Sequence, residues 1–312
     1  MIYIDDDLKI ITQYAWIFAN LPEIKKLTYE AIRGTELEEY LLNLEQRYPA
    51  KYVKTGHVTF ITVENKEKLA SEFTENDQVI LQKISDAIDQ NYDNSIESKW
   101  GSSNPNVHAD MARWAGERNG VSGANLNAIA NNADAPDLST WNYGTPGVGR
   151  YYDHYYGPVK VGPVTLMLGA AHTKTNQFIQ EARKGNNTYV NIGYATHYMC
   201  DISNPLHANK ATDQVLTVLS DQHTKYETYM SGNWTNGQNY SRFAQNVGWQ
   251  KTITNPTNDV TILSAYSGSY ADTVYNCMKN NQFNNSSLFY ATIFCVDEGQ
   301  GYLIGLVQYG LN

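Results

Sequence analysis

The sequence predicts an all-α fold for residues 100–312, preceded by a mainly helical α+β unit over residues 1–99. Long segments carry apolar residues three and four positions apart, which is the spacing of one helix face. A single segment alternates in the manner of a strand. Charge also separates the two units, because 29 of the first 99 residues are charged and only 26 of the remaining 213. The change falls near residues 91–99.

The first unit is predicted to contain four helices and one strand. The helical segments are Leu8–Ala19, Leu21–Arg33, Glu36–Arg47 and Asn76–Asn91, with Asn76 as the cap of the last one. His57–Val63 alternates and is rich in β-branched residues, which favours a strand. His57 stands alone and is read as an ordinary strand or surface histidine.

The second unit is predicted to be helical with long connections. Helices are expected at Val107–Glu117, Val164–Lys184, Thr188 to about Ser203, and Ser286–Leu311. Gly185-Asn-Asn ends the second of these helices, and Pro205 ends or bends the third because proline lacks an amide donor. Ser220 or Asp221 can cap a further helix. A long loop spans residues 135–150.

Composition excludes several classes of protein. The chain has 312 residues, 42% of them hydrophobic, and a net charge of −9, which argues against general affinity for nucleic acid or anionic lipid. No stretch approaches the roughly 18 consecutive apolar residues of a membrane span. The start lacks the layout of a secretory signal, so the protein acts inside the cell or its signal is not part of this chain. Three cysteines leave the redox compartment open.

Five residues of metal-ligand type lie within 31 positions, although the chain has only seven histidines. His197, Asp201 and His207 form His-x3-Asp-x5-His, and His223 and Glu227 form His-x3-Glu. Residues four apart share a helix face, so each pair can direct an imidazole and a carboxylate at one cation. Cys200 points about 100° away from Asp201 on a helix, which favours a buried thiol over a ligand.

Two other interpretations of this cluster are open. Helical His–acid pairs are commonly solvent-exposed ion pairs, and a structural zinc site is also conceivable. A structural zinc usually recruits thiolates in a closed tetrahedron, whereas mixed His and carboxylate ligands favour open, water-binding metals.

The segments His197-Tyr-Met-Cys-Asp-Ile-Ser-Asn-Pro-Leu-His-Ala-Asn209 and His223-Thr-Lys-Tyr-Glu227 closely resemble the two central motifs of the bacterial zinc-dependent phospholipases C. The resemblance covers about residues 100–312. It implies a helical domain with three zinc ions and nine ligands, the first of which is the N-terminal tryptophan of the mature enzyme.

Four further segments match this pattern in order. Trp100 and His108 resemble the family's N-terminal tryptophan and the histidine that follows it. Asp134 resembles the family's first aspartate ligand, and His154 resembles its second histidine ligand. Asp137, three residues after Asp134, competes for that position. By resemblance, the three zinc ions are bound by Trp100, His108 and Asp201; by Asp134, His154, His197 and Asp201; and by His207, His223 and Glu227. His172 falls outside the pattern.

The same resemblance reinterprets the first unit. If Trp100 must present a free α-amine, residues 1–99 are a propeptide that is removed, and a trypsin-like protease could cut the Lys99–Trp100 bond. An independent helical domain with a linker tryptophan is the competing interpretation.

The implied activity is hydrolysis of a phospholipid on the glycerol side, giving diacylglycerol and a phosphorylated headgroup. By resemblance, Asp134 is the general base and Tyr151 an aromatic headgroup contact. The carboxylate that recognises choline in the best-studied enzymes is missing after Trp100, so we expect an altered or broad headgroup preference. The resemblance further implies a secreted monomer that acts on phospholipid at a membrane surface or as monomers and is activated by a protease.

Two other functions are compatible with the sequence. Single-strand nucleases share the helical fold and three-zinc layout, but their final pair is usually His with Asp, whereas this chain has His223 and Glu227. A non-catalytic, exported zinc-binding protein is the other possibility, and Asn-x-Ser/Thr acceptors would suit it at Asn186, Asn233, Asn239, Asn284 and Asn285.

Overall fold

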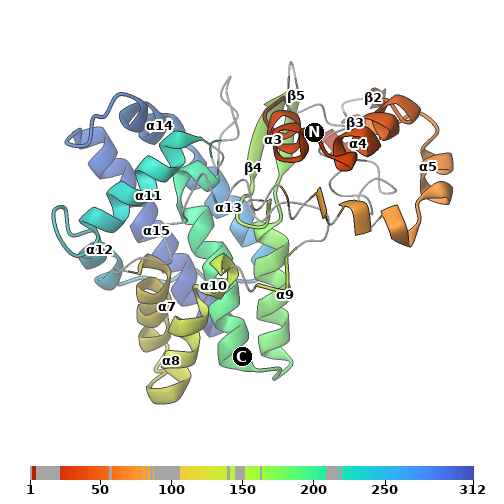
Figure 1. Cartoon of the computed structure of the whole chain (residues 1–312). Helices are drawn as coiled ribbons and strands as arrows, with labels where there is room; N and C mark the ends of the chain where they lie inside the picture. The colour runs from red at the N-terminus through yellow and green to blue at the C-terminus, as the bar shows by residue number, and fades with distance from the viewer. Residues whose placement is uncertain are drawn as a thin grey trace. The chain divides into compact units, whose positions relative to one another are not determined.

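The computed structural model of the chain describes residues 2–4, 22–55, 58–77, 79–81, 83, 84, 87, 106–138, 141–144, 152–161, 164–208, 217 and 220–312. The chain forms two compact units. One comprises residues 1–96, 145–150 and 159–167, and the other residues 97–144, 151–158 and 168–312. Figure 1 labels the elements of both. The predicted division into residues 1–99 and 100–312 as propeptide and catalytic domain stays a prediction.

The first unit combines helices with a three-stranded sheet. Its helices are α3 (Pro22–Ile32), α4 (Glu36–Arg47) and α5 (Lys66–Glu72), and its strands are β1 (Ile2–Ile4), β2 (Ala50–Thr55) and β3 (Val58–Val63). β3 lies in the middle, parallel to β1 and antiparallel to β2. Leu41 and Leu44 of α4, Val63 of β3 and Leu69 of α5 are buried. The unit is therefore α+β, as predicted.

Several sequence-based boundaries in this unit need correction. The predicted strand starts at Val58, whereas β1, β2 and α5 were not predicted. The described residues between 75 and 87 are helical, so the last helix starts before Asn76. Thr74 caps it, because its hydroxyl accepts from the Asp77 amide and the Asp77 carboxylate accepts from the Thr74 amide. Residues 8–19 and His57 lie outside the described residues.

The second unit is helical, which confirms the all-α prediction. Its longer helices are α7 (Val107–Arg118), α8 (Gly123–Asn132), α9 (Ala171–Arg183), α10 (Thr188–Ser203), α11 (Asp221–Asn233), α13 (Pro256–Gly268), α14 (Ala271–Lys279) and α15 (Ser286–Leu311). α12 (Ser241–Gln245) and the 3-10 turns η1 (Ala135–Asp137) and η3 (Pro205–His207) complete it. None of the helices in the described part of the chain has the length and hydropathy to cross a membrane.

α10 is the central helix. It packs against α7, α8, α9, α13 and α15, and every side chain from Ala195 to Ser203 is buried. Because the helix is covered on all sides, it has no polar face. The metal-ligand residues it carries are therefore held inside the protein.

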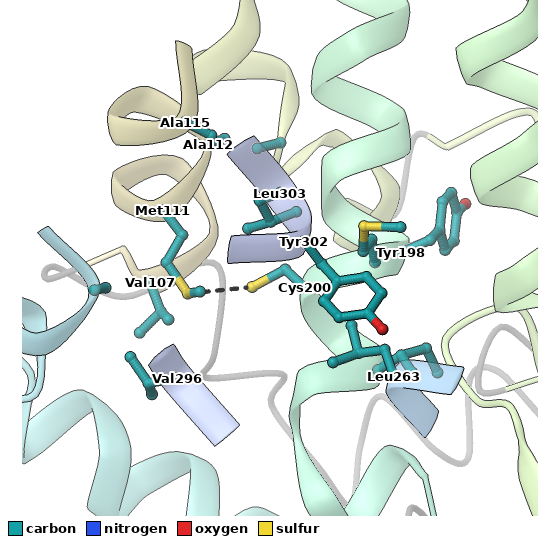
Figure 2. Close-up of a cluster of buried hydrophobic side chains, with 14 of the residues drawn as sticks. Val107, Met111, Ala112, Ala115, Tyr198, Cys200, Leu263, Val296, Tyr302 and Leu303 are labelled. Atoms are coloured by element: carbon teal, nitrogen blue, oxygen red, sulfur yellow. Dashed lines mark hydrogen bonds between the residues drawn. The ribbon is translucent and has the colours of Figure 1, made fainter. Parts of the chain in front are cut away.

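A cluster of buried side chains joins α7, α10 and α15 (Figure 2). The thiol of Cys200 lies 3.6 Å from the sulfur of Met111, between Val107 and Leu303 of the neighbouring helices. Cys200 is buried and forms no disulfide, which confirms that it is a core thiol. Cys277 and Cys295 are also buried and form no disulfide.

One predicted helix is wrong at its start. Residues 164–168 form strand β5 (Val164–Leu168), which pairs with β4 (Gly157–Val161). Gly169, with φ of +99°, follows β5, and α9 begins at Ala171. The backbone amides of the Val-Thr-Leu-Met-Leu segment can form hydrogen bonds with a partner strand. This contact is non-local, so the spacing of apolar residues along the sequence does not predict it.

Candidate metal centre

Five elements position the candidate ligands His108, His154, His197, Asp201, His207, His223 and Glu227. α7 carries His108, the turn before β4 carries His154, α10 carries His197 and Asp201, η3 carries His207, and α11 carries His223 and Glu227. Asn106 caps α7 by accepting from the Ala109 amide, and Ser220 caps α11 by accepting from the His223 amide. Each cap fixes the first helical turn, where a ligand residue lies.

Among the residues that the structure describes, three groups of ligand-type side chains result, each with its ligand atoms within 4.8 Å of one another. They are His108, His197 and Asp201; Asp137, His154 and His197; and His207, His223 and Glu227. All of these residues are buried except the partly buried Asp137. Trp100 and Tyr151 lie outside the described residues, so their predicted roles stay predictions.

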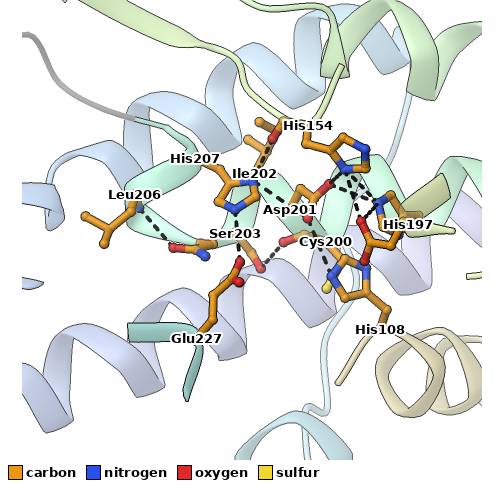
Figure 3. A network of polar contacts seen from close by, with 12 residues as sticks. His108, His154, His197, Cys200, Asp201, Ile202, Ser203, Leu206, His207 and Glu227 are labelled. Atoms are coloured by element: carbon orange, nitrogen blue, oxygen red, sulfur yellow. Dashed lines mark hydrogen bonds and ion pairs between the residues drawn. The ribbon is translucent and has the colours of Figure 1, made fainter. Parts of the chain in front are cut away.

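Asp201 lies where the groups meet (Figure 3). One of its oxygens is 2.8 Å from His154 Nδ1 and 3.2 Å from His197 Nε2, and the other is 3.4 Å from His108 Nε2. The ring of His108 also stacks on that of His197, with centroids 4.3 Å apart. A single carboxylate thus faces ligands of two groups, which is the arrangement of a bridging ligand.

The third group is compact. His207 Nε2 lies 2.7 Å from His223 Nε2 and 3.4 Å from Glu227 Oε1, and His223 Nε2 lies 2.7 Å from the same oxygen. In Figure 3, Glu227 points to His207. The other oxygen of Glu227, Oε2, is buried and has no hydrogen-bond partner. Such an oxygen is costly to bury in a protein unless a cation or a donor satisfies it.

Backbone carbonyls fix the tautomers of two histidines. His197 Nδ1 lies 2.6 Å from the carbonyl of Ala133, and His207 Nδ1 lies 2.6 Å from the carbonyl of His154. Because a carbonyl can only accept, both Nδ1 atoms must carry hydrogen. In each neutral ring the lone pair is then on Nε2, which faces the other ligand atoms. Histidine ligands of metals are typically held in this way.

The donor sets fit zinc. Two ligand nitrogens bound at about 2.1 Å to a tetrahedral ion lie roughly 3.4 Å apart. The nitrogen pairs at 2.7 and 2.9 Å would therefore move apart by about 0.5–0.7 Å on binding an ion. Each group offers imidazole and carboxylate and no thiolate. Such sets leave positions for water and are typical of catalytic sites.

The charges of the site follow from burial and from the pairing of acids with imidazoles. Burial by itself would lower the pKa of His197, but Asp201 and Asp137 raise it to about 9. Burial would likewise raise the pKa of Asp201, yet the rings of His197, His154 and His207 hold it well below its usual range. The carboxylate of Asp201 is therefore ionised and stabilises positive charge, whether on protonated imidazole or on a metal ion.

Asp137, and not Asp134, joins His154 and His197. Asp137 Oδ1 lies 3.6 Å from His154 Nδ1 and 3.5 Å from His197 Nε2, whereas Asp134 belongs to none of the three groups. The 3-10 turn η1 separates the two acids by three residues, which places both on one side of the turn. Burial raises the pKa of Asp134 to about 7, and Asp134 Oδ1 has no hydrogen-bond partner.

The sequence alone did not identify the residues that hold the ligands in place. Thr217 and Ser264 bind the backbone next to two candidate ligands. Thr217 Oγ1 donates to the carbonyl of Leu206, beside His207, and Ser264 Oγ donates to that of Tyr156, two residues after His154. The amide of Tyr156 donates to the carbonyl of His207. Serine and threonine in such roles carry no sequence signal of their own.

Comparison with known proteins finds similarity among solved structures. No family model and no curated protein matches the sequence. Among solved structures, the chain is similar to the alpha toxin from Clostridium absonum, with a TM-score of 0.42 and 18% identity. The match covers 69% of this chain and 65% of the toxin chain, which is less than two thirds of the toxin's length.

Proposed function

We propose that residues 100–312 form a zinc-dependent phosphodiesterase that hydrolyses phospholipids on the glycerol side. Water and the phosphodiester would give diacylglycerol and a phosphorylated headgroup. The observation that carries this proposal is the joining of three buried His/carboxylate groups, two of them through Asp201. The resemblance of residues 197–209 and 223–227 to the phospholipase C motifs supplies the substrate class.

The chain's residues have separate roles in this proposal. His108 and Asp201 would hold one zinc together with Trp100. A second would be held by Asp137, His154, His197 and Asp201, and the third by His207, His223 and Glu227. Bound zinc supplies positive charge for phosphoryl oxygens and lowers the pKa of water. Asp134 lies beside this centre and accepts a proton as the general base. Its raised pKa, about 7, suits that task near neutral pH.

Residues 1–99 are proposed to be an inhibitory propeptide of a secreted, monomeric enzyme. Only cleavage between Lys99 and Trp100 gives Trp100 a free amine. The uncut chain would therefore lack the amine ligand of Trp100 at the first zinc. We infer that an external protease activates the enzyme.

The test combines metal analysis with hydrolysis, before and after cleavage by a trypsin-like protease. We expect three zinc ions and cleavage of short-chain phosphatidylcholine in the cut chain only. A Lys99→Gln chain, treated identically, is the control because it offers no cleavage site at this bond. Full activity of a chain shown by mass to be uncut would refute the propeptide.

The same experiment separates the other functions. Faster cleavage of single-stranded DNA than of the phospholipid would identify a nuclease. Three bound zinc ions without hydrolysis of either substrate would identify a non-catalytic zinc protein. Fewer than two zinc ions in both forms would refute the metal centre itself.

A further inference from the structure

Among the lysines and arginines whose burial the structure describes, Lys174 is the only buried one, with 6% of its surface exposed. It lies in α9, between the buried residues Ala171 and Phe178. A buried ammonium is costly unless charged or polar partners replace its water. Its position therefore depends on the groups it contacts.

Those contacts join α9 to two other segments. Lys174 Nζ donates to the carbonyl of Tyr143 at 2.5 Å, and it lies 3.7 Å from the buried carboxylate of Asp153. The two segments also approach each other directly, because a Cβ on Gly144 would lie 3.7 Å from Asp153 Oδ2. Lys174 thus connects residues 141–144, residues 152–156 and α9.

The second of these segments contains His154, which immediately follows Asp153. Its backbone is fixed on both sides of His154, since the Ala170 amide donates to the carbonyl of Tyr152 and the Ala171 amide to that of Tyr155. Lys174 adds a contact to the side chain between them. Ala170 and the first turn of α9 therefore hold the segment around His154 at three points: residues 152, 153 and 155.

From this geometry we infer that Lys174 is a positioning residue for the ligand His154. Its ammonium anchors Asp153, and the anchored residue directs the ring of His154 toward Asp137, His197 and Asp201. Metal–ligand distances tolerate only about 0.2 Å of variation, so a small rotation of this segment is enough to weaken the site. The inference rests on the proposed function, because it requires His154 to bind zinc.

The test measures zinc binding to the full, uncut chain, by competition with a chromogenic chelator and by the absorption spectrum of Co(II) in the same sites. Lys174→Met keeps the length of the side chain and removes its charge. We expect the zinc affinity of the group of Asp137, His154 and His197 to fall roughly 10- to 100-fold, as for other residues that orient a ligand. The Co(II) spectrum of that group should change as well.

Two further variants separate positioning from support of the fold. Lys184 lies at the end of the same helix, where it is exposed and paired with Glu181. Lys184→Met should therefore leave zinc affinity unchanged. The double variant Lys174→Met/Asp153→Asn removes both buried charges, so it should fold and still bind zinc weakly. Unfolding of each metal-free chain is measured alongside.

The outcomes distinguish this inference from the proposed function. A wild-type chain that binds no zinc refutes the proposed function. Normal zinc affinity in Lys174→Met, or recovery of both affinity and stability in the double variant, overturns the role of Lys174. Weak zinc binding and an altered Co(II) spectrum in a double variant of wild-type stability support it.

Discussion

Replacing Gly169 by alanine should damage the metal centre from a position that holds no ligand. Gly169 has a φ of +99°, a conformation that L-residues rarely adopt. A Cβ built there would lie 1.8 Å from the carbonyl oxygen of Tyr155 and 2.4 Å from its carbon. The obstacle is backbone, so no side chain can rotate out of the way.

The size of the effect follows from this distance. A tolerable contact needs roughly 3.2 Å, so the two backbones must separate by about 1.4 Å. Such a shift breaks or stretches the hydrogen bonds from Ala170 to Tyr152 and from Ala171 to Tyr155. Each such bond contributes about 1 kcal/mol, and the backbone strain adds about 1–2 kcal/mol. The total is a loss of about 3–4 kcal/mol in the free energy of unfolding.

Gly185→Ala is the matched control, because Gly185 has a similar φ of +82° but no atom within 4 Å of the added Cβ. It should show only the strain, about 1–2 kcal/mol, and normal zinc affinity. Denaturant unfolding in chelator gives the free energies, and chelator competition gives the affinities. Equal destabilisation by the two substitutions, or unchanged zinc affinity in Gly169→Ala, would refute the reasoning.

Three other predictions concern the centre and its surroundings. His223→Ala should remove one zinc ion. It should also weaken zinc binding at the remaining sites about threefold to tenfold in chelator competition, because His207 is hydrogen-bonded to the backbone of His154. Unchanged affinity at those sites would mean that the groups are independent. Asp137→Asn should lower zinc affinity at least about tenfold, whereas Asp134→Asn should mainly slow hydrolysis, and the reverse pattern would restore Asp134 as the ligand. Burial lowers the pKa of His172 to about 4, so its contribution to stability is present above pH 6.5 and is lost as pH falls toward 4, by at most about 3 kcal/mol. Comparison of unfolding curves with His172→Phe isolates this term, and a difference that does not vary with pH would contradict it.

Local patterns predicted much of the second unit. α10 spans Thr188–Ser203 and α15 spans Ser286–Leu311, as expected from their apolar spacing, and Ser220 caps α11. The i,i+4 pairs also follow from helix geometry alone, since His197 lies 3.2 Å and His223 2.7 Å from their acids. These features depend on residues within one or two turns.

Contacts between distant segments could not be predicted in this way. The strand β5 depends on pairing with β4, and the contact of Asp137 with His154 and His197 depends on how η1 packs over α10. Asp134 and Asp137 are chemically identical and three residues apart in a tight turn. Only the path of the chain beyond that turn distinguishes them.

The break at Pro205 shows how a local signal and a distant contact combine. On a continued α10, His207 would lie six residues after Asp201, which rotates it about 240° away from that carboxylate around the helix axis. The chain instead turns at Asn204, whose side chain accepts from the Leu206 amide, and η3 returns His207 Nδ1 to within 3.7 Å of Asp201. Proline predicts that the helix ends, but the direction of the turn is set by the carbonyl of His154, which accepts from His207. The carbonyl of one candidate ligand, His154, thus orients another, His207, and links the third group of ligand-type side chains to the other two.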